Sequence, residues 1–344
     1  MADTNRSWPL LGLAAGVSVA AAAAVATAAL LRRARRGRLA LARRACPLTQ
    51  EAVAGLGLPA VSRFVQAGDL QFHTILAGPE DGPLALLLHG FPECWYSWRH
   101  QIPVLARAGY RVAVPDQRGY NLSDKPRGLP HYQIDRLTGD ILALIGALGH
   151  ARATIIAHDW GGAAAWRFAM DHPQAVERLV VMNAPHPVAF AKALRNDWSQ
   201  RARSWYMAFF QLPWLPETLL TLYPMVSARL FFRRTAVRRQ AFSGDDLIVL
   251  AAAMAQPGAM ACMINWYRAA FRTRAANKAR PVDAPTLLIW AEDDVALGMP
   301  LTLGLEPWVP DLQIHYISRC GHWVQNEAPA EVNRLLLDFL PEGA

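Results

Sequence analysis

The stretch 153–162, with the sequence ATIIAHDWGG, decides the fold of this chain. Residues 154–157 are apolar or β-branched and predict a short buried strand, and the glycines and alanines that follow predict a helix packed closely on it. Between the two stands Asp159, with the small residues Ala157 and Gly161 two positions away on either side. Small residues at these positions are typical of a sharp strand-to-helix turn that presents a nucleophile at its apex.

An aspartate at this apex allows two interpretations. A carboxylate cannot act as a serine-type acyl-transfer nucleophile, but it can open a strained ring or displace a leaving group and so form an alkyl ester. The alternative is an ordinary β–α turn in which the Asp159 side chain only caps the helix.

Composition indicates one large domain, or one domain with an insertion. The chain has 344 residues, 53% of them hydrophobic and 18% charged, which is enough to bury a sizeable core. Of the net charge of +8, seven charges come from arginines between Arg32 and Arg44, which leaves +1 for the rest and no nucleic-acid-binding footprint. Four scattered cysteines lack metal-type spacing and are typical of reduced thiols in an intracellular protein: Cys46, Cys94, Cys262 and Cys320.

The amino terminus predicts a single-pass membrane anchor. No charged residue occurs from Trp8 to Leu31, a run long enough to span a bilayer as a helix. The arginines follow this run, which argues against a cleaved signal peptide and keeps the carboxyl side cytoplasmic by the positive-inside rule. We therefore expect an anchor over 1–31 and, over 32–59, a basic linker suited to anionic membrane lipid.

This topology places the folded domain on the cytoplasmic face of a membrane. That membrane is the endoplasmic reticulum if the chain is eukaryotic and the inner membrane if it is bacterial. An uncleaved, loosely ordered extension and an arginine-rich targeting peptide are the alternatives for the same segment.

Strands and helices alternate through the rest of the chain, which predicts an α/β fold with an open, mostly parallel sheet. In such a sheet the active site lies beyond the carboxyl ends of the strands. The first part of this core is expected over 60–185 and the second over 281–344, separated by an aromatic-rich helical cap over 186–280. The expected strands are 64–66, 70–77, 84–88, 110–114, 154–157, 178–182, 286–290 and 313–317, with helices over 134–148, 159–170 and 329–339.

Candidate partners of Asp159 follow other strands. His322 comes after the last strand, and an imidazole can take a proton from water at neutral pH. Three carboxylates, Glu292 to Asp294, follow the strand before it. The order nucleophile, acid, histidine is that of an α/β-hydrolase, in which backbone amides, here those of Phe91 and Trp160, form the oxyanion hole.

Four motifs together resemble the epoxide hydrolases of the α/β-hydrolase superfamily. They are HGFPE (89–93), HDWGG (158–162), NWYR (265–268) and CGHW (320–323), and the resemblance covers about residues 64–340. Within this family the chain is most similar to the membrane-anchored vertebrate-type branch and its bacterial relatives. Two positions depart from the family pattern, since Ala157 and Asn121 stand where glycine is commoner.

The resemblance implies hydrolysis of an apolar epoxide to a vicinal diol through an ester on Asp159, with no metal or cofactor. Two cap tyrosines, Tyr206 and Tyr267 by their motifs, would hold and protonate the epoxide oxygen. The triad acid falls on Asp294, with Asp293 as the fallback. Side chains expected to line the substrate pocket are His89, Trp95 and Trp266.

Two other functions compete with this hypothesis. A haloalkane or haloacid dehalogenase would use the same aspartyl ester, with indoles such as Trp160 and Trp95 binding the halide. A non-catalytic, membrane-tethered binding protein could keep the fold without the chemistry. The sequence predicts neither the particular epoxide nor an oligomeric state.

Overall fold

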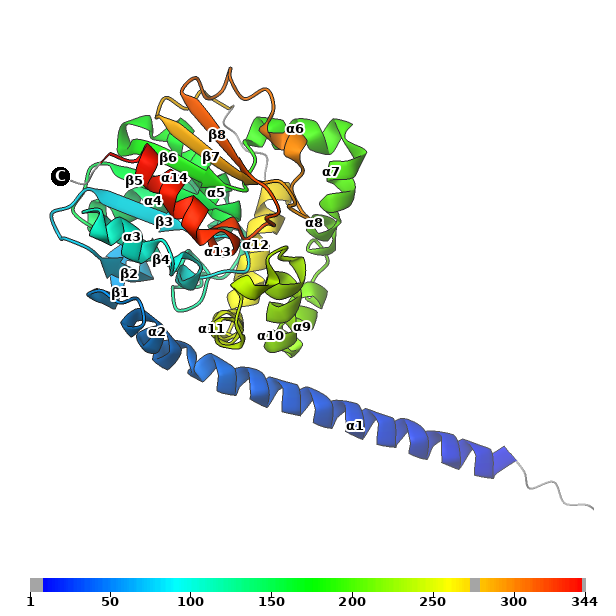
Figure 1. Cartoon of the computed structure of the whole chain (residues 1–344). Helices are drawn as coiled ribbons and strands as arrows, with labels where there is room; N and C mark the ends of the chain where they lie inside the picture. Colours follow the sequence, from blue (N-terminus) through cyan, green and yellow to red (C-terminus); the bar gives the residue numbers. More distant parts are fainter. Residues whose placement is uncertain (1–8, 273–278, 342–344) are drawn as a thin grey trace, which may run out of the picture.

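An eight-stranded sheet forms the centre of the protein (Figure 1). The computed structural model describes residues 9–272 and 279–341, with side chains from residue 26 onward. The strand order is β1-β2-β4-β3-β5-β6-β7-β8, and only the β1–β2 and β2–β4 pairs are antiparallel. The strands are β1 (Ala60–Ala67), β2 (Leu70–Ala77), β3 (Leu84–Leu88), β4 (Arg111–Pro115), β5 (Ala153–His158), β6 (Val176–Met182), β7 (Thr286–Ala291) and β8 (Leu312–Ile317).

This arrangement confirms the predicted mostly parallel α/β sheet. The central strands are continuous apolar runs because helices cover both of their faces, and β3 and β5 are buried along their whole length. The prediction for β1 was too short, since the strand begins at Ala60 rather than at Phe64. Its residues 61–64 are all exposed. Their sequence therefore lacks the alternation of buried apolar and exposed polar residues from which a strand is predicted.

Helices connect and cover these strands. The helix α5 begins directly at the end of β5, and the helix α14 begins and ends where the sequence predicts. The helices of the core are α3 (Ile102–Arg107), α4 (Ile134–Ala147), α5 (Asp159–Asp171), α13 (Val324–Glu327) and α14 (Pro329–Phe339).

A group of helices, here called the cap, lies between β6 and β7 in sequence and gathers beside one end of the sheet (Figure 1). Residues 273–278, near the predicted end of the cap, lie outside the described residues. The cap helices are α6 (Pro187–Asn196), α7 (Trp198–Arg203), α8 (Trp205–Phe209), α9 (Leu215–Leu222), α10 (Pro224–Ala228), α11 (Gly244–Met254) and α12 (Ala259–Arg272), with a π-helical turn, η4, over Arg229–Arg233.

One long helix, α1 (Pro9–Arg43), crosses the predicted boundary between anchor and linker. The helix α2 (Ala45–Ala54) follows it, so the predicted linker is mostly helical, as its alanine, leucine and arginine content favours. Residues 1–8 and the side chains before residue 26, which make up most of the predicted anchor, lie outside the described residues.

A search of the described residues finds no single helix long and apolar enough to cross a membrane. Only α11 and α12 together meet the criteria of length and composition, and they are bent by 75° at the break between them.

Candidate active site

The turn at Asp159 is as tight as its sequence predicts. Asp159 begins α5 with a φ of +49°, a left-handed conformation that is strained for a residue with a side chain. A Cβ atom at Gly161 would overlap the carbonyl oxygen of Leu88, and one at Gly90 would lie 2.6 Å from Oδ1 of Asp159. Glycine at both positions therefore lets the loop after β3 approach the aspartate directly.

This loop donates a hydrogen bond to the aspartate. The backbone N–H of Phe91 lies 2.8 Å from Oδ1 of Asp159, as expected of an oxyanion-hole donor. The predicted second donor, the amide of Trp160, stays a prediction. The indole of Trp160 packs edge-on against the ring of Tyr267, with their centroids 4.8 Å apart.

His322 lies between two carboxylates. Its Nδ1 is 2.6 Å from Oδ2 of Asp294, and its Nε2 is 3.6 Å from Oδ2 of Asp159. Of the two candidate acids, Asp294 is buried against the imidazole and Asp293 is exposed. The structure thus places the His322 imidazole between the carboxylates of Asp159 and Asp294.

Backbone and side-chain donors fix the orientation of Asp294. Its Oδ1 accepts hydrogen bonds from the amides of Ala296 and Leu297, at 2.7 and 3.0 Å. Its Oδ2 accepts a 2.7 Å bond from Nδ2 of Asn183, besides facing His322. With all of these partners in place, the carboxylate has one stable orientation toward the imidazole.

Charges in the site keep the carboxylates ionised. Burial alone would raise the pKa of Asp159, but its interaction with the His322 imidazole 3.6 Å away outweighs burial and holds the pKa below the usual value. The same balance between burial and His322 lowers the pKa of Asp294. Burial would lower the pKa of His322, but Asp294 and Asp159 raise it well above 6.5.

Two tyrosines from different cap helices pack against each other, and one of them also packs on Trp160, the residue after Asp159. Tyr206 comes from α8 and Tyr267 from α12, and their rings lie 5.9 Å apart at an angle of 84°. Burial raises the pKa of both phenols, and the negative charge of Asp159 raises it further. Both hydroxyls therefore stay protonated at neutral pH.

The three residues expected to line the substrate pocket are all buried, and their role there stays a prediction. His89 is fully buried, and its Nε2 accepts a 3.1 Å hydrogen bond from the Gln117 amide. Trp95 is also fully buried. Trp266 is 1% exposed and donates a 3.2 Å hydrogen bond from its indole to the carbonyl of Arg118.

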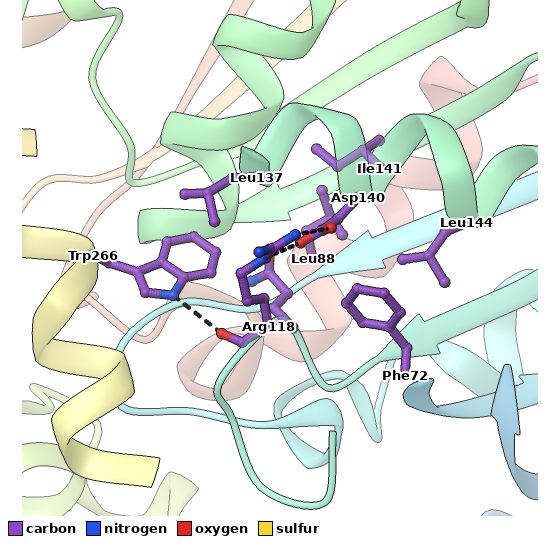
Figure 2. A pocket seen from close by; sticks show the side chains of 9 residues that line it. Phe72, Leu88, Arg118, Leu137, Asp140, Ile141, Leu144 and Trp266 are labelled. Atoms are coloured by element: carbon purple, nitrogen blue, oxygen red, sulfur yellow. Dashed lines mark hydrogen bonds and ion pairs between the residues drawn. The ribbon is translucent and has the colours of Figure 1, made fainter. Parts of the chain in front are cut away.

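Figure 2 shows the surroundings of Trp266. The cavity beside it has a volume of about 10 Å³ and is closed on one side by the Arg118–Asp140 ion pair. Such a volume holds at most about one water molecule, so this cavity is no substrate site. Its other walls are formed by Phe72, Leu88, Gln117, Leu137, Ile141 and Leu144.

A second buried network, which the sequence did not predict, supports the backbone of His322. Nδ1 of His158 lies 2.7 Å from Oε2 of Glu93, and its Nε2 lies 2.8 Å from the carbonyl of His322. Gln325 donates a 2.9 Å hydrogen bond to the other oxygen of Glu93. Both residues of the central pair belong to recognised motifs, but only the fold shows that they meet.

Among the described residues, no group of three or more histidine, cysteine, aspartate or glutamate side chains could hold a metal ion.

Sequence comparison first defines the class of protein. Residues 83–329 match the family model described as the α/β hydrolase fold. Together with the mostly parallel sheet and the tight turn at Asp159, this match makes the protein an α/β hydrolase.

Individual relatives define the family within that class. The chain is 40% identical over 280 residues to the AB hydrolase superfamily protein YfhM of Bacillus subtilis, which covers 81% of this chain and 97% of that protein. It is 36% identical over 292 residues to epoxide hydrolase 4 of Homo sapiens, covering 83% of this chain and 80% of that protein.

Solved structures similar to this chain also include epoxide hydrolases. The epoxide hydrolase of Bacillus megaterium, in complex with an inhibitor, has a TM-score of 0.75 at 30% identity and covers 80% of this chain and 99% of that chain. A mutant of that enzyme, complexed with its product, a naphthyloxy-propane-1,2-diol, has a TM-score of 0.74, 30% identity and the same coverage. The chain belongs to the epoxide hydrolase family of the α/β hydrolases.

Proposed function

We propose that the protein hydrolyses an apolar epoxide to a vicinal diol through a covalent ester on Asp159. The observation that carries this proposal is a carboxylate, not a hydroxyl, at the apex of the turn, followed directly by Trp160, which packs on Tyr267, which in turn packs on Tyr206. An epoxide oxygen is a poor leaving group unless it receives a proton, and two phenols can supply it.

In the first step, Oδ2 of Asp159 attacks a ring carbon. A new C–O bond forms to the aspartate while the ring C–O bond breaks, and the ring oxygen takes a proton from Tyr206 or Tyr267. The raised pKa of both phenols means that the phenolate left behind regains its proton readily from solvent. The product of this step is a neutral hydroxyalkyl ester.

In the second step, water cleaves the ester. His322, oriented by Asp294, takes a proton from water, and the hydroxide attacks the ester carbonyl carbon. The amides of Phe91 and Trp160 bind the oxyanion that develops, and the first of them already donates to Oδ1 of Asp159. The diol leaves with the proton from His322. The carboxylic acid left on Asp159 releases its proton to solvent, which restores the carboxylate and balances the proton that the phenolate took up in the first step.

Aromatic rings around the phenols support an apolar substrate. Phe91 packs edge-on against Tyr267, Phe210 and Phe231, with ring centroids 5.1 to 5.6 Å apart. Such rings bind hydrocarbon and exclude water from the ester. The naphthyl product of the Bacillus megaterium relative agrees with this substrate class.

We further infer that the amino-terminal segment anchors the enzyme in a membrane with the catalytic domain on its cytoplasmic face. The support is the charge-free run from Trp8 to Leu31 followed by seven arginines, together with the unbroken helix α1. This arrangement holds the enzyme where apolar substrates dissolve.

A direct assay on two substrates tests the reaction. One preparation is given styrene oxide and, separately, a short haloalkane, and diol and halide are measured. We expect diol without halide, and Asp159→Ala should abolish it while circular dichroism stays that of the parent. Halide release without diol would assign the dehalogenase reaction instead.

A further inference from the structure

The cap carries a group of exposed apolar side chains around α9 and α10. Each of them leaves 45–70% of its surface exposed to solvent, which is unusual for so many large apolar groups in one short stretch. We call this group the cap rim; it consists of Leu212, Trp214, Leu219, Tyr223, Val226 and Leu230.

The cap rim lies beside the place where α1 leaves the body of the protein. The carboxyl-terminal part of α1 contacts α9 and α11, and Ala34 is buried there. Farther along, Nε2 of Gln256 donates a 2.7 Å hydrogen bond to the carbonyl of Ala42. Figure 1 shows α1 continuing outward past α9 and α10, so the helix is fixed to the cap at one end only.

The apolar part of α1 begins at the level of this contact. The charge-free run ends at Leu31, three residues before the buried Ala34, which is about 5 Å along a helix. A bilayer that holds the run must therefore reach the protein beside α9. Leu30 and Leu31 are themselves 57% and 49% exposed, as lipid-facing residues would be.

We propose that the cap rim rests in the interfacial layer of the bilayer that α1 enters. Tryptophan and tyrosine prefer this layer, and Trp214 and Tyr223 stand among the leucines and valine of the rim. The exposed Arg229, Arg233 and Arg234 adjoin the rim and complement anionic headgroups. This inference rests on the membrane anchor proposed above, and it adds a second contact, through the cap.

Such a contact is connected to the active site through the cap. Arg268, next to Tyr267 on α12, forms an ion pair with Glu217 on α9. The same guanidinium donates a 2.9 Å hydrogen bond from Nε to the carbonyl of Phe210. A membrane that holds α9 therefore also supports the helix that carries one of the phenols.

A fluorophore placed on the rim tests the contact in the full-length chain. The exposed thiol is removed by Cys46→Ser, and a single new cysteine, Leu219→Cys, is labelled with an environment-sensitive dye. The matched control is Leu337→Cys, also an exposed helical leucine, near the end of α14 that lies away from α9 in Figure 1. Both proteins are reconstituted sparsely into phosphatidylcholine–phosphatidylglycerol vesicles with nitroxide-labelled headgroups.

We expect a blue-shifted emission and quenching by the nitroxide at position 219 and neither at 337. Vesicle flotation and diol formation are measured on the same samples. Quenching tests the rim contact, flotation tests the membrane anchor, and diol formation tests the enzymatic function. A chain that floats with an unquenched 219 label would overturn the rim contact and leave the anchor standing. A blue shift without quenching would assign the rim to a second copy of the chain.

A chain that does not float would refute both the anchor and the rim contact. Diol formation in that sample would still support the enzymatic function.

Discussion

Nε2 of His322 lies 3.6 Å from Oδ2 of Asp159, while Nδ1 of the same ring lies 2.6 Å from Asp294. The first distance is too long for a hydrogen bond and the second is a short one. The imidazole is thus held by one carboxylate and left free to serve the other. The pKa of His322 must then be lower in the ester intermediate than in the free enzyme, because the ester removes the negative charge of Asp159, which helps to raise that pKa.

Replacing the histidine should separate the two steps. In His322→Gln, ring opening by Asp159 still occurs, but no base activates water, so turnover falls by about 10²–10⁴-fold. Intact-mass measurement after exposure to styrene oxide should show one added substrate mass, located on Asp159 by peptide mapping. The control, Asp159→Ala with His322→Gln, should stay unmodified. An adduct in the control, or none in the single variant, contradicts covalent catalysis by Asp159.

The ester should accumulate as the pH falls. Ring opening needs ionised Asp159, whose pKa lies below its usual value, so acid slows it little. Ester hydrolysis needs neutral His322, and this form is lost as the pH falls through the pKa of that group, which Asp294 helps to raise. Rapid-quench trapping should therefore find a larger fraction of esterified enzyme at pH values below neutrality. An ester fraction that rises with pH would contradict this order.

Removing either phenol should slow ring opening. Tyr206→Phe and Tyr267→Phe each take away one proton donor, and we expect about 10²-fold lower kcat for each and a larger loss for the double variant. Ester formation should be the slowed step, seen as a lower pre-steady-state rate. Tyr316→Phe, on an exposed tyrosine of β8 outside the cap, is the control and should keep the parent rate. Equal rates in all variants would remove the phenols from the mechanism.

The sequence predicted the elements around Asp159 because each strong signal there was local. Continuous apolar runs gave β3 and β5, and motif order selected His322 and Asp294. The first residues of β1 are all exposed and show no alternation of apolar and polar side chains, so the start of this strand was not predicted. Residues 32–59 were predicted to be a linker, but helix-favouring residues continue through them and form the end of α1 and all of α2.

Side-chain environments were harder to predict than positions. His89 and Trp95 lie in or near a catalytic motif, yet spacing alone does not show that both are fully buried. The contact of Glu93 with His158 joins residues 65 positions apart in sequence, and it depends on the β3–β5 register. These features follow from packing, which a single sequence does not display.

A methyl group at Gly90 should disturb the aspartate without unfolding the protein. The added Cβ would lie 2.5 Å from Cβ of Asp159, so the loop or the turn must move and weaken the 2.8 Å bond from the Phe91 amide. We expect Gly90→Ala to lower kcat by about 10²-fold, as small misplacements of reacting groups do. Crowding of this kind also costs about 1–3 kcal/mol of unfolding free energy.

The matched control is Gly139→Ala, inside α4. A Cβ there meets nothing within 4 Å, so the substitution should leave kcat unchanged and add about 0.4–1 kcal/mol of stability. Urea unfolding and diol formation, measured on both variants, separate crowding at the nucleophile from the general effect of replacing glycine. A Gly90→Ala enzyme with the parent kcat would show that the close approach of the β3 loop to Asp159 is not needed for turnover.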